Sequence, residues 1–150
     1  MTTHLSKPFL LDPSTPLGPT RYAHARTIQT GSSTTMYISG IAAVTPAGKI
    51  EGITTHPDGS YKPDVRAQTS AVLNRIEAII KGASENKAGL SNIVDATVYL
   101  VDMERDYSGF NEVWNGVYKT RESAPTRATV EVGGLPDKRL VVEVKAIAVF

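Results

Sequence analysis

The chain has 150 residues, and its 16 Lys plus Arg against 15 Asp plus Glu give a formal net charge of +1. This length fits one domain with a core of its own, and the absence of Cys excludes disulfides, thiolate nucleophiles and Cys-containing zinc sites, as is typical of a cytoplasmic protein. The chain lacks an apolar stretch near the roughly 20 residues of a membrane span, which excludes an integral membrane protein, and its near-neutral charge disfavours nucleic-acid binding.

The first 20 residues contain four Pro and follow no helical or alternating period. They predict an extended arm, residues 1–20, ahead of a single domain over residues 21–150. Two strands are predicted next, over residues 21–29 and 36–41, because a turn-forming Gly-Ser-Ser sequence separates them. Residues 46–63 are rich in Gly, Pro, Thr and Asp and predict a loop, with at most a short strand near residues 49–53.

Residues 64–82 carry apolar side chains at spacings of three and four, between Pro63 and Gly82, which predicts an amphipathic helix. Residues 93–101 alternate between apolar and polar side chains and predict a strand. A second helix is predicted over residues 103–119, and its apolar stripe holds most of the aromatic side chains.

Two final strands are predicted over residues 126–132 and 140–149, joined by a turn that contains Gly133-Gly134. Both helices must bury their apolar stripes against the strands. The order of elements therefore predicts an α+β fold in two layers, a mixed sheet with two helices packed on one face.

The sheet face that the helices leave uncovered is expected to carry both charged and apolar side chains. We assign Arg127, Thr129 and Glu143 to this face from the alternation along the last two strands. Tyr99 and Ile147 give the same face apolar area that is poorly suited to water. Such a face indicates a contact between subunits, and a half-solvated sheet surface is an equally good interpretation.

Several short motifs occur along the chain in a fixed order. They are Arg21-Tyr22-Ala23-His24-Ala25, Tyr37-Ile38-Ser39-Gly40, Gln68 with Asn74, Phe110-Asn111-Glu112-Val113, Pro125-Thr126-Arg127 and Leu140–Val149. From Tyr22 onward the chain resembles the Rid (YjgF-like) reactive-intermediate deaminase family. Within that family, the combination of Arg-Tyr-x-His-Ala-Arg, Arg-Ala-Gln-Thr, Phe-Asn-Glu-Val and Pro-Thr-Arg is most similar to the 2-aminomuconate deaminase branch.

The resemblance implies a chorismate-mutase-like fold and a homotrimer, whose sheets form a central barrel-like core with three clefts between neighbouring subunits. It assigns Arg127, the Arg of Pro-x-Arg, to the substrate carboxylate. A planar guanidinium presents paired donors that match a carboxylate, which Lys cannot do. From the residue type alone, an ion pair of Arg127 with Glu131 or Glu143 is the alternative.

The resemblance assigns the proton chemistry to Glu143. Hydrolysis of an enamine or imine needs a proton on carbon and a water directed at the C=N carbon, and one carboxyl group can serve either step by general acid–base catalysis. A salt bridge to Lys145 of a neighbouring strand or subunit is the alternative. The family pattern also implies one further catalytic residue, Asn111, and the substrate-binding residues Tyr22, His24, Ser39, Gly40 and Thr129.

Two positions depart from the family pattern. Many members carry Gln after Ser-Gly and Cys two residues after the Arg, whereas this chain has Ile41 and Thr129. Thiol chemistry is therefore excluded. Thr129 can still line the pocket through its hydroxyl group, and Ile41 predicts a more apolar wall.

No metal or other cofactor is expected, because His4, His24 and His56 lack the spacing of paired metal ligands and no Gly-rich phosphate loop is present. The sequence predicts a cytoplasmic, cofactor-free homotrimer that hydrolyses a small carboxylate-bearing enamine or imine. The first substrate is 2-aminomuconate, giving 4-oxalocrotonate and ammonia, and the second is 2-aminoacrylate or 2-iminopropionate. The alternatives are a metabolite-binding or regulatory trimer without catalysis and, least favoured by the charge, a ribonuclease or translation inhibitor.

Overall fold

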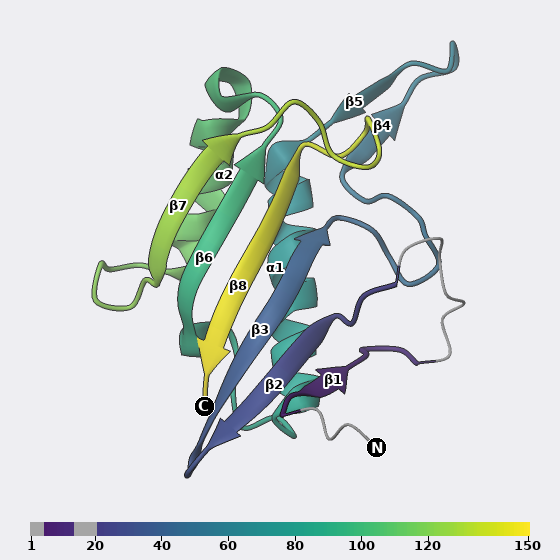
Figure 1. Cartoon of the computed structure of the whole chain (residues 1–150). Coiled ribbons are helices and arrows are strands. Elements are labelled where there is room, and N and C mark those ends of the chain that lie inside the picture. Colours follow the sequence, from purple (N-terminus) through teal and green to yellow (C-terminus); the bar gives the residue numbers. More distant parts are fainter. Residues whose placement is uncertain (1–4, 14–20) are drawn as a thin grey trace.

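Alternating apolar side chains along the strands and apolar stripes along two helices build a two-layer structure (Figure 1). The computed structural model describes residues 5–13 and 21–150. Its elements are β1 (Lys7–Phe9), β2 (Ala25–Thr30), β3 (Ser33–Ala42), β4 (Ile53–Thr55), β5 (Tyr61–Pro63), α1 (Val65–Ala83), a 3-10 turn (Leu90–Asn92), β6 (Ile93–Leu100), α2 (Met103–Val117), β7 (Thr126–Glu131) and β8 (Val142–Val149). Both α-helices cover the same face of a six-stranded sheet. The predicted α+β fold is confirmed.

The sheet has the strand order β1-β2-β3-β8-β6-β7, and all neighbours are antiparallel except β6 and β7. β6 and β7 run parallel because α2 carries the chain back through the helix layer between them. The predicted mixed sheet is therefore confirmed. β8 is the last strand in sequence but lies between β3 and β6, so that hydrogen bonds on both sides hold the strand that carries Glu143.

Each helix begins at an aspartate whose side chain accepts hydrogen bonds from the free backbone N–H groups of the first turn. Asp64 caps α1 and Asp102 caps α2. The apolar stripes then pack on the sheet, with Val72, Ile76, Ile79 and Ile80 of α1 and Phe110 and Trp114 of α2 buried. None of the helices in the described ranges is long and apolar enough to cross a membrane.

The strand register decides which side chains face the helices. In the parallel pairing of β6 with β7, Arg127 lies beside Ala96 and Thr129 beside Val98, and both β6 residues are buried in the core. Arg127 and Thr129 therefore face the helix layer, and their assignment to the uncovered face is wrong. The alternation along β7 gave the wrong face because Ala128, which is apolar and was expected to face the helices, faces the open side of this edge strand.

Glu143 faces away from the helices. Its partner across the β6–β8 pairing is Tyr99, while the alternate residues Val142 and Val144 are buried in the core. The assignment of Glu143 and Tyr99 to the uncovered face is confirmed. Glu143 and Arg127 consequently lie on opposite faces of one sheet.

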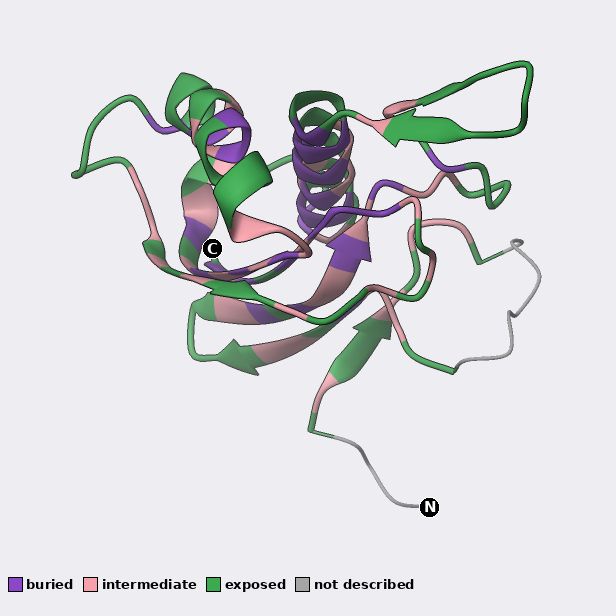
Figure 2. Cartoon of the chain, turned by 90° about the horizontal axis from the view of Figure 1, so that it is seen from above, coloured by how far each residue is buried: buried purple, intermediate pink, exposed green. Residues whose placement is uncertain are grey.

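The segment predicted as a loop with a short strand near residues 49–53 contains a hairpin instead. β4 and β5 pair as a separate two-stranded sheet, which extends away from the body with exposed strands (Figure 2). Asp58 accepts hydrogen bonds from the N–H and hydroxyl groups of Ser60, and Gly59 adopts a φ of 82° in this turn. These turn residues close the hairpin although its strands have little apolar alternation.

Part of the predicted arm adds a strand to the sheet. β1 pairs with β2 and forms one edge of the sheet, and Arg26 donates hydrogen bonds to the side chain and carbonyl group of Ser6. Phe9 packs over α1, where a Cβ atom on Gly82 would lie 2.7 Å from its ring. The remainder of the predicted arm, residues 1–4 and 14–20, lies outside the described residues.

Gln68 of α1 fixes the segment that enters β8. Its side chain is fully buried, its amide group donates to the carbonyl of Arg139 at 2.8 Å, and its oxygen accepts from the N–H of Val141 at 2.9 Å. Buried backbone groups need such partners, because an unpaired one keeps its full desolvation penalty.

We expect Gln68→Leu to lower the free energy of unfolding by about 1–3 kcal/mol, because the buried N–H of Val141 and the partly buried carbonyl of Arg139 lose their partners. Urea denaturation at neutral pH measures this change. The matched control is Gln29→Leu, which alters an exposed glutamine in β2. Equal midpoints for the two variants would contradict the structural role of Gln68.

Candidate active site

A pocket of about 280 Å³ opens beside the last residues of β3 and the first residues of β8. The segment before β2, the loop after β3 and the middle of α1 complete its walls, and Leu11 and Asp12 of the arm line one side. Four residues that the sequence analysis assigned to the site line this pocket, namely Tyr22, His24, Gly40 and Glu143.

Glu143 is the titratable group best suited to proton transfer in this pocket. Its side chain is half-buried, and this burial raises the pKa of Glu143 above its ordinary value of 4.5. Within the described ranges no cation forms an ion pair with Glu143, so the predicted alternative of a salt bridge with Lys145 is not formed in this chain. A raised pKa keeps more of the carboxyl group protonated near neutrality.

Gly40 allows Glu143 to occupy this position. A Cβ atom at residue 40 would lie 2.2 Å from Oε1 of Glu143, so any larger residue would force this carboxyl group to move. The pairing of β3 with β8 shifts its register between Ile38 and Ile41, and this bulge places Gly40 against the carboxyl group. The missing side chain at Gly40 therefore makes room for a side chain of this chain itself.

His24 connects the pocket to the N-terminal arm. The backbone N–H of Leu11 donates to Nδ1 of His24 at 3.0 Å, which requires the unprotonated form of that nitrogen. Burial and the positive charge of Arg75 lower the pKa of His24. The imidazole is thus a neutral group at the pocket wall.

Tyr22 and Ser39 lie around the rim. Tyr22 is 65% exposed and lines the pocket. Ser39 donates its hydroxyl hydrogen bond to the carbonyl of Ala23 at 2.7 Å, so it holds the segment before β2. This side chain faces a shallower hollow beside the main pocket.

Arg75 also lines the pocket, and the sequence analysis did not select it. Its guanidinium group donates to the carbonyl of Val44, in the loop after β3. On α1 Arg75 lies one turn from Ala71, Val72, Ala78 and Ile79, so it stands at the border of the apolar stripe. No signal in the sequence shows that the loop after β3 folds over this part of α1.

The other three predicted residues lie elsewhere, at the edge formed by α2 and β7. The guanidinium carbon of Arg127 lies 5.3 Å from the ring centre of Phe110 and 5.0 Å from that of Trp114, as in cation–π contacts. The hydroxyl oxygen of Thr129 is buried and has no hydrogen-bond partner among the described residues. Asn111 is half-buried on α2, directly after Phe110.

The predicted site residues thus fall into two groups within one chain. Tyr22, His24, Ser39, Gly40 and Glu143 gather near the ends of β3 and β8, and Arg127, Thr129 and Asn111 gather at the far edge strand. The predicted ion pair of Arg127 with Glu131 is also absent from the described ranges, where Glu131 instead accepts from the N–H of Met103 at 2.7 Å. Arg127 contacts two aromatic rings and forms no ion pair with another described residue.

Metal coordination has no visible basis in the part of the chain that the structure covers, because no three His, Asp or Glu side chains cluster there in a way that could hold an ion. His24 uses one ring nitrogen for the arm, and His56 lies exposed after β4. His4, the third histidine considered, lies outside the described residues.

The chain is similar in sequence and in structure to known proteins. A model of the family described as endoribonuclease L-PSP matches residues 15–150. A RutC family protein of Pyrococcus horikoshii is 34% identical over 134 residues, which are 89% of this chain and 88% of the relative. A RutC family protein of Sulfurisphaera tokodaii is 32% identical over 126 residues, or 84% of each chain. The solved structure of E. coli TdcF with bound serine superimposes with a TM-score of 0.68 at 27% identity, covering 96% of this chain and 99% of TdcF.

The raised pKa of Glu143 predicts a pH-dependent change in stability. In the unfolded chain this carboxyl group ionises at its ordinary value of 4.5, whereas the folded chain disfavours the charged form. Stability is therefore lost as the pH rises from the ordinary value through the raised one. We expect Glu143→Gln to have a higher melting temperature than the parent protein at pH 7, with the difference shrinking below pH 4.5.

Thermal melts across this pH range test the expectation, with Glu122→Gln in the exposed loop after α2 as the control. Identical pH profiles for the two variants would show that Glu143 is not penalised by burial.

Proposed function

The chain belongs to the endoribonuclease L-PSP family, which includes the RutC and YjgF proteins, and we propose that it is a hydrolytic deaminase of small carboxylate-bearing enamines or imines. The observation that carries this proposal is the half-buried carboxyl group of Glu143, with its raised pKa, in an accessible pocket. The first candidate substrate is 2-aminomuconate, which gives 4-oxalocrotonate and ammonia. The second is 2-aminoacrylate or its tautomer 2-iminopropionate.

The proposed reaction adds one water and releases one ammonia. In its protonated form, Glu143 donates a proton to the enamine carbon, which gives the iminium ion. The resulting carboxylate accepts a proton from the water that attacks the C=N carbon and passes this proton to the amino group of the carbinolamine. Ammonia then leaves with the electron pair of the C–N bond, and the hydroxyl group returns its proton to Glu143 as the ketone forms. Water is the only co-reactant, so the reaction needs no cofactor.

Arg127 is the proposed anchor for the substrate carboxylate. Stacking over two aromatic rings orients the guanidinium plane without using its N–H donors, so that they remain available for a bidentate contact. E. coli TdcF, at 27% identity, was solved with serine, a small molecule that also carries a carboxylate. This neighbour supports a carboxylate ligand for the present chain.

The opposite orientations of Arg127 and Glu143 support a site shared between two copies. A hydrogen-bonded sheet separates the two side chains in one subunit, so they can contact one substrate only if a second copy supplies one of them. We propose a homotrimer with such a cleft at each of its three subunit contacts. The open sheet face, with Tyr37, Val130 and Val149 more than a third exposed, offers apolar area for the proposed central core.

The remaining predicted residues take supporting roles in this proposal. Asn111 and Thr129 enter the cleft beside Arg127, where the unpartnered hydroxyl of Thr129 can bond to the substrate. On the Glu143 side, Tyr22 and His24 bind the substrate, and Ser39 and Gly40 shape the floor.

Ribonuclease activity is a second candidate, because the description of the matching family names it. A net charge of +1 gives little attraction to a phosphate backbone, which argues against tight RNA binding. A metabolite-binding trimer without turnover would use the same pocket, and ammonia release separates it from a deaminase.

The proposal predicts ammonia release from 2-aminomuconate with distinct defects in two variants. Glu143→Gln should lower kcat by about 100-fold or more, because the amide cannot transfer a proton. Arg127→Lys should lower kcat/KM by about tenfold or more, since an ammonium group cannot bind a carboxylate bidentately.

Coupled detection of ammonia measures both effects. The controls are Glu122→Gln and Arg121→Lys, in the exposed loop between α2 and β7. Full activity in either site variant would refute the role assigned to that residue. Ligand-dependent stabilisation without ammonia from any enamine would instead indicate a binding protein.

A further inference from the structure

Arg75 is the cation of the Glu143 pocket that the family resemblance leaves without a role. It projects from the middle of α1, is half-buried, and lines the same cavity as Glu143. The carbonyl of Val44 accepts one hydrogen bond from this guanidinium, which has five N–H donors in all. Arg75 therefore has hydrogen-bonding capacity left over inside a cavity.

Among the described residues, no carboxyl group forms an ion pair with Arg75. Glu51 acts on it only through a longer-range attraction. Burial lowers the pKa of Arg75, which shows that the surroundings disfavour its charge. A desolvated cation with free donors is stabilised by an anion that enters the cavity.

The other residues that line the pocket limit the chemical structure of a ligand that carries such an anionic group. Ile41 and Leu140 provide apolar walls, and His24 is neutral because its Nδ1 accepts from the arm. The other charged groups of the lining are the carboxyls of Glu143 and Asp12. A ligand with an apolar or unsaturated middle and an anionic end directed at Arg75 fits this distribution.

We propose that Arg75 is a specificity-determining residue that binds a second carboxylate, so that the substrates of this protein are dicarboxylates. This inference rests on the proposed function, in which Arg127 of a neighbouring copy binds the carboxylate next to the reacting carbon. Arg75 then takes the distal one, and Glu143 lies in the same pocket as that distal anchor. The dicarboxylate 2-aminomuconate satisfies both cations, whereas 2-aminoacrylate has one carboxylate and leaves Arg75 without an anion.

Two unreactive probes test the inference without depending on turnover. trans,trans-Muconate and sorbate share a carbon skeleton and conjugated double bonds, but muconate has two carboxylates and sorbate has one. Calorimetric titration of the full chain should show muconate binding about tenfold or more tightly than sorbate, because only muconate reaches Arg75.

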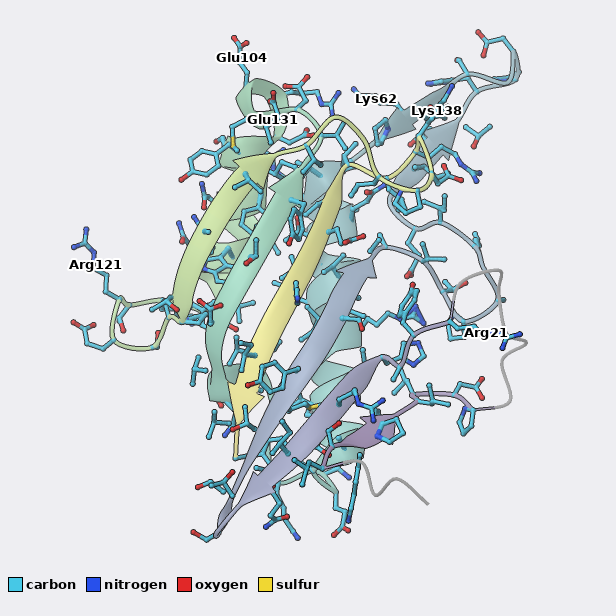
Figure 3. All side chains as sticks on the ribbon, in the orientation of Figure 1. Arg21, Lys62, Glu104, Arg121, Glu131 and Lys138 are labelled. Atoms are coloured by element: carbon cyan, nitrogen blue, oxygen red, sulfur yellow. The ribbon has the colours of Figure 1, made fainter. Side chains whose placement is uncertain are left out.

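Variants of Arg75 make the test specific. Arg75→Gln should remove the preference for muconate while leaving the affinity for sorbate unchanged. Arg121→Gln is the matched control, because Arg121 projects into solvent from the loop between α2 and β7 (Figure 3), and it should keep the preference. If Arg75→Gln folds poorly, Arg75→Lys, which keeps a donor for the Val44 carbonyl, should weaken muconate selectively.

Two results would overturn the role of Arg75. One is an unchanged ratio of muconate to sorbate affinity in the Arg75 variants, and the other is an equal loss for both probes, which would indicate a structural role in holding Val44. Failure of the proposed function gives a different result, namely no ammonia from any enamine whatever the probe affinities are. The binding preference and the deaminase activity are thus tested separately.

Discussion

Side chains alternate across a β-sheet, so the pairing of β8, β6 and β7 decides which charged groups of this chain can meet. Glu143 lies on the open face beside Tyr99, and Arg127 lies on the helix-covered face beside Ala96. No change of rotamer brings two side chains through a hydrogen-bonded sheet. A substrate that contacts both residues must therefore lie between two copies, which makes assembly of the subunits a condition for the proposed chemistry.

Burial gives the pocket its chemical character. The missing side chain at Gly40 lets the sheet close around Glu143, and the resulting desolvation raises the pKa of that carboxyl group. The loop after β3 covers Arg75 in the same way and disfavours its charge. In the proposed function, this one partly closed cavity provides both the acid for proton transfer and the cation for an anionic ligand. Burial is the cause of both pKa shifts, although Glu143 belongs to the sheet and Arg75 to the helix layer.

Sequence reasoning predicted the two helices, the mixed sheet and four of the residues that line the pocket, because periodicity and ordered motifs reflect local structure. It placed Glu143 on the correct face, because its neighbours Val142 and Val144 face the core and side chains alternate along a strand. It placed Arg127 on the wrong face, because edge strand β7 is apolar on its open side as well. Arg75 was missed because its exposure depends on where a distant loop folds, and no spacing within α1 records this.

The central claim is that Arg127 and Glu143 act on one substrate from different copies. Arg127→Ala and Glu143→Gln, each inactive alone, are mixed in equal amounts, unfolded and refolded together, and ammonia release from 2-aminomuconate is measured. In randomly mixed trimers about a quarter of the clefts combine an intact Glu143 with an intact Arg127 from the neighbour, so we predict recovery of about a quarter of the parent activity. Activity no higher than that of the two variants refolded separately would contradict the shared site.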